Sequence, residues 1–554
     1  MMTRFSLPGR RLLALAAIVG LQSVASAAPV SVPANGLIWR SHYAGRTALA
    51  RGTNATVLRR VDQLPASAAF RGQIAAGLAR APREFWQKDL PAGAPDATEL
   101  WNPLFADLLD AESVLEVRGP VGRTEAALAI QLAAPRAKVW NDNLSRLASL
   151  WKLGQATPLK LAGAEGWQCR RAQSPNLFQY VRIGDWVVLG LGQDPLSLAP
   201  ALVQQIMRTG RPGPLADPTL LVDVHADLPA LGTWFPWLTR YGLPPLHLTA
   251  RGRGEHVRTE VQFRLPTPLR TTLDPWQFPT NLIGEPLTSF TVARGVNGLL
   301  NAIPGLAQAG LKPLPNQFCA WGVSNEQSRV YMAAPVANPG PAISQLAVGL
   351  PPFFKDRFGQ IFGEFFYVSN RNYLFWGNIP FVQPYLQPVT NAGQTFLHAG
   401  VFPLPPRQTP PPPDLFSQLA ARPTLLYYDW EITPQRILNG RLLWDLVHIL
   451  SKHLPQGETS PSRLWLAAVL PELWKDPVNP SQSVTEITLA SPNELRLVRK
   501  SHLGLTGFEM ASLSAWADSP GFPLRYVPPR RMTEPRGTNA PPKRSVNPAA
   551  PAPR

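Results

Sequence analysis

One short segment contains the residues of this sequence whose types and spacing could do chemistry. Residues 217–229 read DPTLLVDVHADLP, in which Asp223, His225 and Asp227 alternate with small apolar residues. A period of two places these three side chains on one face of a β-strand. Carboxylates and imidazoles are zinc ligands and also serve as general acids and bases. The segment therefore suggests a metal-assisted hydrolase that uses Asp223, His225 and Asp227.

A second segment argues against that hypothesis. Residues 422–434 read RPTLLYYDWEITP, with the same PTLL start and the same terminal proline. Aligned on PTLL, the three polar positions become Tyr428, Trp430 and Ile432. What the two segments share is a strand entered from proline, followed by a residue that can cap a helix. We therefore favour a structural role for the segment and keep the hydrolase as an alternative.

Two further matches occur in the same order along the chain. LAAP at 132–135 matches MAAP at 332–335, and FQYVRIGDWVVLG at 178–190 matches FFYVSNRNYLFWG at 365–377. The longer match has the pattern of a β-hairpin, with two apolar runs around a polar turn. Three matches in one order indicate an internal duplication. The sequence thus predicts an α+β fold of two diverged copies, each a mainly antiparallel or mixed sheet with helices packed on it.

Each copy is expected to run strand, helix, hairpin, helix, hairpin, helix, strand, helix, hairpin. Around the copies, composition divides the chain further. The predicted segments are a signal peptide (1–27), a first copy (28–266), a connection (267–287), a second copy (288–524) with a proline-rich loop (402–416), and a disordered basic, proline-rich tail (525–554). The signal peptide predicts a secreted or periplasmic protein.

The formal net charge of +17 is concentrated partly in the signal peptide and the tail. The remaining excess is mild, so we expect no nucleic-acid partner, although it leaves room for weak contact with anionic envelope polymers or a membrane surface. No segment after residue 27 approaches 18 uninterrupted apolar residues, which predicts no transmembrane segment in the mature chain.

Other residues provide weaker binding hypotheses. Trp234 and Trp237 lie in an aromatic segment, TWFPWLTRYG, and exposed tryptophans stack on sugars, although a core position is the better interpretation. Arg251 and Arg253 lie near a predicted turn, where they could contact an anion or simply face solvent. A disulfide between Cys169 and Cys319 is allowed in an oxidising compartment, but two unpaired buried thiols are favoured.

Common catalytic signatures such as GxSxG, HExxH and the phosphate loop are absent from the sequence. We therefore expect a non-catalytic binding or envelope-associated structural protein, without a cofactor, whose ligand lies in the groove between the copies. The alternatives are the metal-assisted hydrolase and a carbohydrate- or peptidoglycan-binding protein that uses exposed tryptophans.

Overall fold

The computed structural model describes residues 36–527, with gaps at 86–89, 91–92, 121, 171–174, 214–216, 218, 240–241, 270–272, 303–312, 324–328, 359–362, 380–381, 405–408, 410–412, 451–458 and 477–479. The predicted signal peptide lies outside these residues, as does the predicted tail from residue 528 onward. Among the described residues, no helix combines the length and the apolar character needed to cross a membrane.

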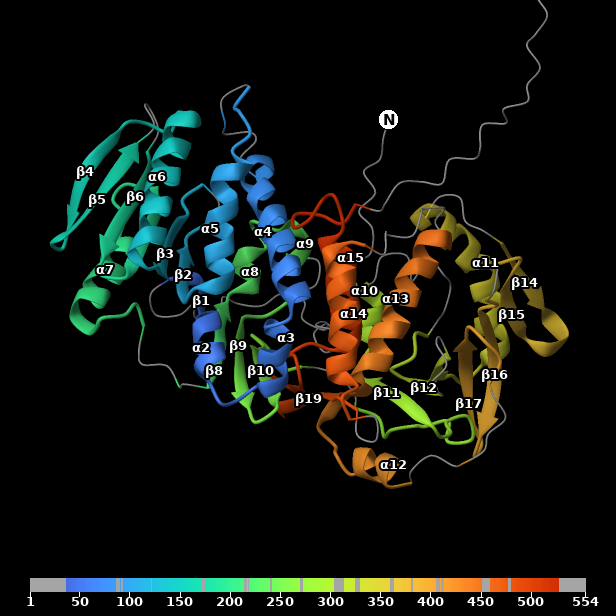
Figure 1. Cartoon of the computed structure of the whole chain (residues 1–554). Coiled ribbons are helices and arrows are strands. Elements are labelled where there is room, and N and C mark those ends of the chain that lie inside the picture. Colours follow the sequence, from blue (N-terminus) through green and yellow to red (C-terminus); the bar gives the residue numbers. More distant parts are fainter. Residues whose placement is uncertain are drawn as a thin grey trace, which may run out of the picture.

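Within the described residues, the N-terminal half, drawn in blue to green in Figure 1, supplies the first ten strands of a twenty-stranded sheet. Its strands are β1 (Leu37–Tyr43), β2 (Ser113–Arg118), β3 (Glu125–Gln131), β4 (Ala156–Leu161), β5 (Ala164–Arg170), β6 (Asn176–Ile183), β7 (Trp186–Gln193), β8 (Leu220–Ala226), β9 (Leu246–Arg253) and β10 (His256–Arg264). Its helices are α2 (Gly45–Arg51), α3 (Thr56–Asp62), α4 (Pro65–Phe85), α5 (Thr98–Asp110), α6 (Ala134–Leu150), α7 (Leu198–Thr209), α8 (Leu228–Leu231) and α9 (Pro236–Thr239).

The C-terminal half supplies the other ten strands. They are β11 (Leu287–Arg294), β12 (Gln317–Val323), β13 (Val330–Pro335), β14 (Glu364–Val368), β15 (Tyr373–Gly377), β16 (Tyr385–Asn391), β17 (Gln394–Gly400), β18 (Leu425–Ile432), β19 (Gln482–Ser491) and β20 (Glu494–Ser501). Its helices are α10 (Asn297–Ala302), α11 (Pro339–Phe358), α12 (Pro413–Ala420), α13 (Thr433–Leu450), α14 (Pro461–Leu473) and α15 (Gly507–Ala517). A 3-10 turn, Ser369–Arg371, separates β14 from β15.

The two halves pair their strands in the same pattern, and the pairs are antiparallel. In the N-terminal half, β1 lies between β2 and β8, β3 joins β2 to β7, β4 to β7 form a meander, and β9 joins β8 to β10. In the C-terminal half, β11 lies between β12 and β18, β13 joins β12 to β17, β14 to β17 form a meander, and β19 joins β18 to β20. The predicted α+β fold with antiparallel pairing is confirmed.

The two halves join where β10 pairs with β20. Their register runs from Val257 opposite Ser501 to Arg264 opposite Glu494, with Glu260 opposite Val498. One row across the sheet reads Asp223, Thr249 and Glu260, and continues through Val498, Glu486 and Tyr428. Because Asp223 and Tyr428 are the aligned residues of the two PTLL segments, this row is symmetric about the pair Glu260 and Val498.

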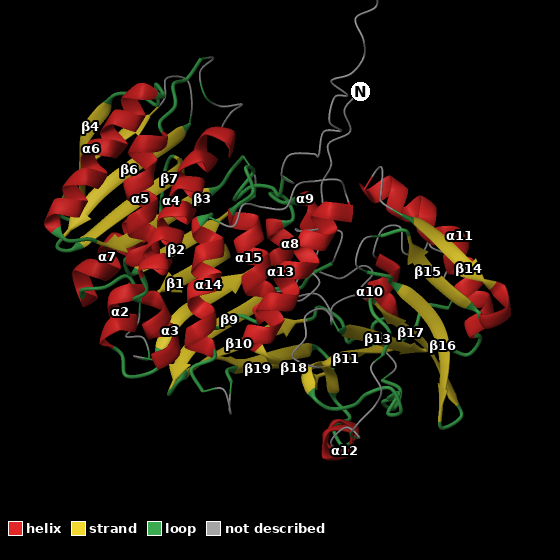
Figure 2. Ribbon diagram, turned by 45° about the vertical axis from the view of Figure 1, so that its right-hand side comes forward, coloured by secondary structure: helices red, strands yellow, loops and turns green. Residues whose placement is uncertain are grey.

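Helices cover one face of the central strands, as Figure 2 shows for α13, α14 and α15. On this face Ala55, at the start of α3, approaches Gly252 of β9, and Glu509 of α15 pairs with Arg499 of β20. A capping box starts α15, because the Thr506 hydroxyl accepts from the Glu509 amide and the Glu509 carboxylate accepts from the Thr506 amide.

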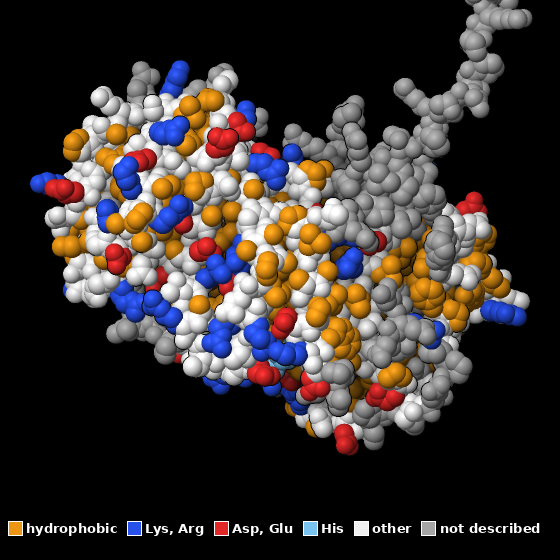
Figure 3. All heavy atoms as spheres, in the orientation of Figure 1, with side chains coloured by type: hydrophobic (Ala, Val, Ile, Leu, Met, Phe, Trp, Pro, Cys, Tyr) orange, Lys and Arg blue, Asp and Glu red, His pale blue; other side chains and the backbone are white. Residues whose placement is uncertain are grey.

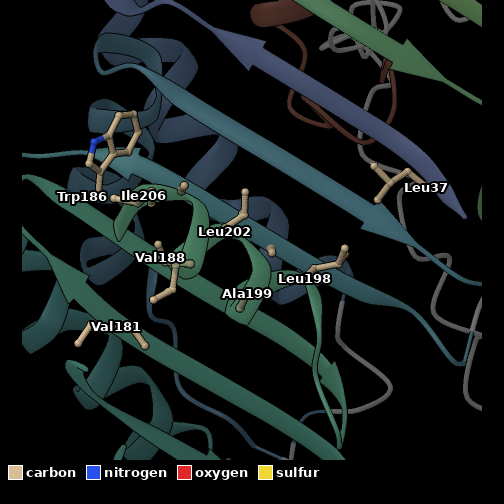
Figure 4. Packing of buried hydrophobic residues seen from close by; sticks show 12 residues of the cluster. Leu37, Val181, Trp186, Val188, Leu198, Ala199, Leu202 and Ile206 are labelled. Atoms are coloured by element: carbon tan, nitrogen blue, oxygen red, sulfur yellow. The ribbon is translucent and has the colours of Figure 1, made fainter. Parts of the chain in front are cut away.

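The opposite face is covered only toward its two ends among the described residues. There α7 packs on β7 and β3 in the N-terminal half, and α12 lies beneath the sheet in the C-terminal half (Figure 2). Figure 4 shows Leu198, Ala199, Leu202 and Ile206 of α7 against Val188 and neighbouring strand residues. Burial of each such leucine or isoleucine side chain stabilises the fold by about 2 kcal/mol. Between these ends, the central strands present polar side chains that we call the open face: Arg40, Asp223, His225, His247, Glu260 and Arg496.

The structure corrects several predicted details. The matched hairpins are not equivalent, because residues 178–190 form β6 and β7, whereas residues 365–377 form β14 and β15, whose pairing corresponds to β4 and β5. Each half also contains one more hairpin than expected.

The described part of the predicted connection, 267–287, forms no strand before β11, only a bridge from Glu285 to Thr409. Two predicted boundaries differ in the structure. The predicted proline-rich loop, 402–416, contains the first turn of α12. The fold continues past the predicted start of the tail, because Tyr526 is buried against Trp444.

Candidate functional site

Asp223 and His225 of β8 meet His247 of β9 on the open face. His225 lies directly opposite His247, and Asp223 precedes His225 by two residues, so all three side chains leave the sheet on the same side. Local sequence reasoning identified two members of this cluster and missed His247. The alternation of apolar and polar residues in LHLTARGR, residues 246–253, indicates a strand. It does not show that this strand pairs with β8 in the register that brings His247 opposite His225, 22 positions earlier.

The three side chains are in direct contact. His247 Nε2 donates a 2.8 Å hydrogen bond to Asp223 Oδ1, and His225 Nε2 lies 3.7 Å from the same oxygen. The two imidazole rings stack with centroids 3.8 Å apart and an angle of 11° between their planes. One nitrogen or oxygen atom from each of the three residues lies within 4.8 Å of the other two.

The surroundings of the cluster favour a neutral His225. Partial burial lowers the pKa of its imidazole, and the adjacent His247 adds to this effect. Arg40 on β1 lies opposite His225, and its positive charge also lowers the pKa of His225. The Arg40 side chain is itself paired, with its Nε 3.4 Å from Glu116 Oε1. A neutral imidazole has a lone pair free for hydrogen bonding or metal coordination.

Asp227 has a different role from the other two residues of its segment. It is the N-cap of α8, and its Oδ1 accepts a 3.0 Å hydrogen bond from the Ala230 amide. This contact satisfies one of the free amides at the start of the helix. The residues that converge are thus Asp223, His225 and His247, while Asp227 caps a helix as the sequence pattern indicated.

A polar pocket of about 640 Å³ lies where the two halves meet. It is formed by α3 and the β9–β10 turn of the N-terminal half together with the end of α14, β19 and the end of β20 of the C-terminal half. Its lining residues are Val57, Arg60, Glu255, His256, Glu472, Leu473, Lys475, Asp476, Pro480, Ser481, Gln482, Val484, Lys500 and His502. In Figure 3, Lys and Arg side chains gather with a few acidic ones over this part of the molecule, below α3.

Two histidines, one from each half, lie side by side in the pocket. The ring centroids of His256 and His502 are 4.2 Å apart. Burial, with smaller contributions from His502 and Lys500, lowers the pKa of His256 to about 4. Burial also lowers the pKa of His502. Both imidazoles are therefore neutral near pH 7, beside an ion pair in which Arg60 Nε lies 3.1 Å from Glu472 Oε2.

The other predicted binding residues are dispersed. Trp234 is half-buried after α8, and its indole nitrogen finds no acceptor among the described residues. Trp237 belongs to α9, but its side chain lies outside the described part of the structure. Arg251 donates to the Thr249 hydroxyl over 2.7 Å, while Arg253 is exposed at the β9–β10 turn.

The two cysteines are free thiols, each buried. Cys169 belongs to β5 of the N-terminal half and Cys319 to β12 of the C-terminal half. Burial raises the pKa of both thiols, that of Cys319 to about 12. Both are therefore protonated at neutral pH, and a thiol is a much weaker nucleophile and metal ligand than a thiolate.

A group of buried ionisable side chains under α13 was not predicted from the sequence. Asp429 and Glu431 of β18 are 3% and 0% exposed, on the face covered by helices. Arg436 of α13 lies 3.8 Å from Asp429 Oδ1 and 3.5 Å from Glu431 Oε2, and the Gly507 amide donates to Glu431 Oε1 over 2.7 Å. Burial, assisted by the neighbouring Asp429, raises the pKa of Glu431 to about 8.

No protein-family model, curated protein or solved structure matches this chain. Functional inference therefore rests on the geometry of the two polar sites described above: the cluster on the open face and the pocket between the halves.

Proposed function

We propose that this chain is a secreted or periplasmic, non-catalytic binding protein that arose by internal duplication and holds a small polar ligand between its two halves. The observation that carries the proposal is the pocket of about 640 Å³, because both halves contribute polar side chains to it. Binding sites concentrate at interfaces between structural units, where a concave surface forms without disturbing either core.

Three features support the duplication. The strand pairing follows the same order in both halves. The two leucines of each PTLL sequence begin strands at equivalent places in the pairing pattern, β8 and β18. The row of paired positions across the junction is symmetric, because Asp223 and Tyr428, the aligned residues of the two PTLL segments, lie equally far from the central pair Glu260 and Val498. A duplicated gene product whose halves pair edge to edge would have this arrangement.

The pocket favours a ligand that carries both signs of charge. Arg60, Lys475 and Lys500 contribute positive charges, and Glu255, Glu472 and Asp476 contribute negative charges. The neutral imidazoles of His256 and His502 add hydrogen-bonding atoms and flat surfaces. Zwitterions such as amino acids, dipeptides or amino sugars match this lining better than an apolar molecule or a polyanion would.

A thermal-shift experiment tests this proposal with a panel of free amino acids, dipeptides and amino sugars. A ligand present at one hundred times its Kd stabilises the fold by about 2.7 kcal/mol, which raises Tm by a few degrees. Lys500→Ala and Glu255→Ala should abolish the shift, whereas Lys138→Ala, on the exposed surface of α6, should retain it. A panel that leaves Tm unchanged, or shifts that persist in both pocket variants, would contradict the proposal.

The alternatives have less support. The hydrolase hypothesis used Asp227 as a third group, and that carboxylate is engaged with the Ala230 amide. The carbohydrate hypothesis needs an exposed tryptophan platform, and Trp234 is half-buried. Weak contact with anionic envelope polymers is a further proposal, based on Arg40 and Arg496 of the open face, which pair there with the carboxylates of Glu116 and Glu260.

A further inference from the structure

We propose that Asp223, His225 and His247 form a binding site for one divalent transition-metal ion, such as Zn²⁺, Ni²⁺ or Cu²⁺. This site shares no residue with the pocket between the halves, so the two proposals stand or fall separately.

The backbone brings the three side chains together. Directly opposed residues on antiparallel strands have Cβ atoms about 5 Å apart, and side chains two positions apart on a strand share a face. His225 and His247 are such an opposed pair, and Asp223 lies on the same side as His225. Both strands are internal to the sheet, because β8 lies between β1 and β9, and β9 lies between β8 and β10. Hydrogen bonds on both sides of each strand therefore fix the backbone positions of the three residues.

The distances between the donor atoms suit a metal ion. Ligand atoms that surround a tetrahedral zinc ion at 2.0–2.2 Å lie about 3.4 Å from one another. The separations of 2.8 Å and 3.7 Å from Asp223 Oδ1 to the two imidazole nitrogens bracket that value. Binding requires the stacked rings to turn toward the ion, and both can do so, because His225 and His247 side chains are 45% and 35% exposed.

The donor set indicates which ions would bind. Two imidazole nitrogens and one carboxylate oxygen are typical of zinc and other first-row transition metals, whereas Ca²⁺ and Mg²⁺ prefer sets made only of oxygen. Three protein ligands leave at least one coordination position for water or for a donor atom from a partner. The exposure of His225 places that position toward solvent.

A comparison with the C-terminal half shows that the sheet itself does not require these residues. The register gives Tyr428 and Trp430 of β18 and Val484 of β19 as the counterparts of Asp223, His225 and His247. Two strands of the same pairing pattern thus form with none of the three donors. The N-terminal half alone has all three at positions that meet, which is expected of a site and not of a structural requirement.

Metal titration of the untagged, EDTA-treated chain tests the proposal. Isothermal titration with ZnCl₂ should give one site per chain, and His225→Ala, His247→Ala and Asp223→Asn should each weaken binding at least about tenfold. With Cu²⁺, the electron paramagnetic resonance spectrum should show coupling to two imidazole nitrogens in the wild type and to one in either histidine variant. Circular dichroism should confirm that each variant remains folded.

The matched control is His256→Ala, which disrupts a second pair of adjacent histidines, His256 and His502, without touching this cluster. Its zinc affinity and Cu²⁺ spectrum should equal those of the wild type. Absence of zinc binding by the wild type would overturn the proposal. So would zinc binding that the double variant His225→Ala and His247→Ala retains, because the ion would then lie elsewhere on the chain.

Discussion

Strands β8 and β18 occupy the same place in the two halves, yet their polarity is inverted. On the open face β8 carries Asp223 and His225, and its other side carries Val224 and Ala226. In β18 the apolar residues Tyr428 and Trp430 replace the first pair, while Asp429 and Glu431 replace the second pair on the face covered by helices.

The segments that cover each strand explain the inversion. The connection before β11 and helix α12 bring Trp276, Phe278 and Phe416 to the cluster in which Tyr428 and Trp430 are partly buried. On the other side, Arg436 of α13 and the Gly507 amide provide partners for the two carboxylates. One backbone pairing pattern thus tolerates opposite side-chain polarity when the neighbouring segments supply matching groups. Four experiments test this difference between the halves.

The largest effect is expected where charge is buried in the C-terminal half. Arg436→Ala should lower the free energy of unfolding by about 3–5 kcal/mol, because Asp429 and Glu431 would lose their cationic neighbour inside the protein. Arg40→Ala on the open face should cost less than about 1 kcal/mol, since its pair with Glu116 is partly solvated. Urea denaturation measures both. Equal losses for the two variants would mean that the halves do not differ in this way.

The next effect concerns the counterparts Trp430 and His225. Trp430→Ala should cost about 2–3 kcal/mol, because it removes a partly buried ring and its 3.0 Å hydrogen bond to Gln482. His225→Ala, measured in EDTA, should cost less than about 1 kcal/mol because the side chain is 45% exposed. Thermal denaturation of both variants measures these two costs. A larger loss of stability for His225→Ala would contradict the inference that this face is covered at β18 and open at β8.

The pH dependence of stability should also separate the halves. With its pKa raised to about 8 from 4.5, Glu431 holds a proton in the folded chain that it loses in the unfolded chain. Its contribution to stability therefore falls as pH rises between about 4.5 and 8, by at most about 1.4 kcal/mol per pH unit. Glu431→Gln should remove this slope, whereas Asp223→Asn on the open face should leave it. Urea midpoints collected from pH 5 to pH 8 provide the measurement, and parallel curves for wild type and Glu431→Gln would refute the assignment.

The smallest effects are expected at the junction, where the halves should behave alike. Glu260 accepts from Arg258 over 2.6 Å and from Arg496 over 2.9 Å, and the register makes these two arginines counterparts. Both are partly exposed, so each change to alanine should cost less than about 1 kcal/mol and by similar amounts. Urea denaturation measures both costs, and a large loss of stability for one variant alone would show that the two halves contribute unequally to the junction.

The α+β class and the antiparallel pairing could be predicted, because alternation and turn residues are local signals. The PTLL segments indicated equivalent strands, and the residue after β8 was expected to cap a helix, as Asp227 does. The hairpin match failed because aromatic hairpins resemble one another, and only pairing distinguishes β6 and β7 from β14 and β15.

The candidate sites were harder to predict, because they too depend on contacts between residues far apart in the sequence. His247 joins Asp223 and His225 through cross-strand register, which the sequence does not encode locally. Alternation along β18 puts Asp429 and Glu431 on one face and Tyr428 and Trp430 on the other, but it does not tell which face is buried by helices. That choice depends on α12, α13 and the connection before β11, which arrive from distant parts of the chain.

The pairing of β10 with β20 has a consequence for how such a protein could assemble. Each of these strands would be an exposed edge in an isolated half, ready to pair with another molecule. If a single half was once a separate protein, the same register would have joined two identical chains as a homodimer. Covalent linkage replaces that concentration-dependent association with an intramolecular one at a high effective concentration. It also frees each half to change its side chains independently, which a symmetric dimer encoded by one gene cannot do.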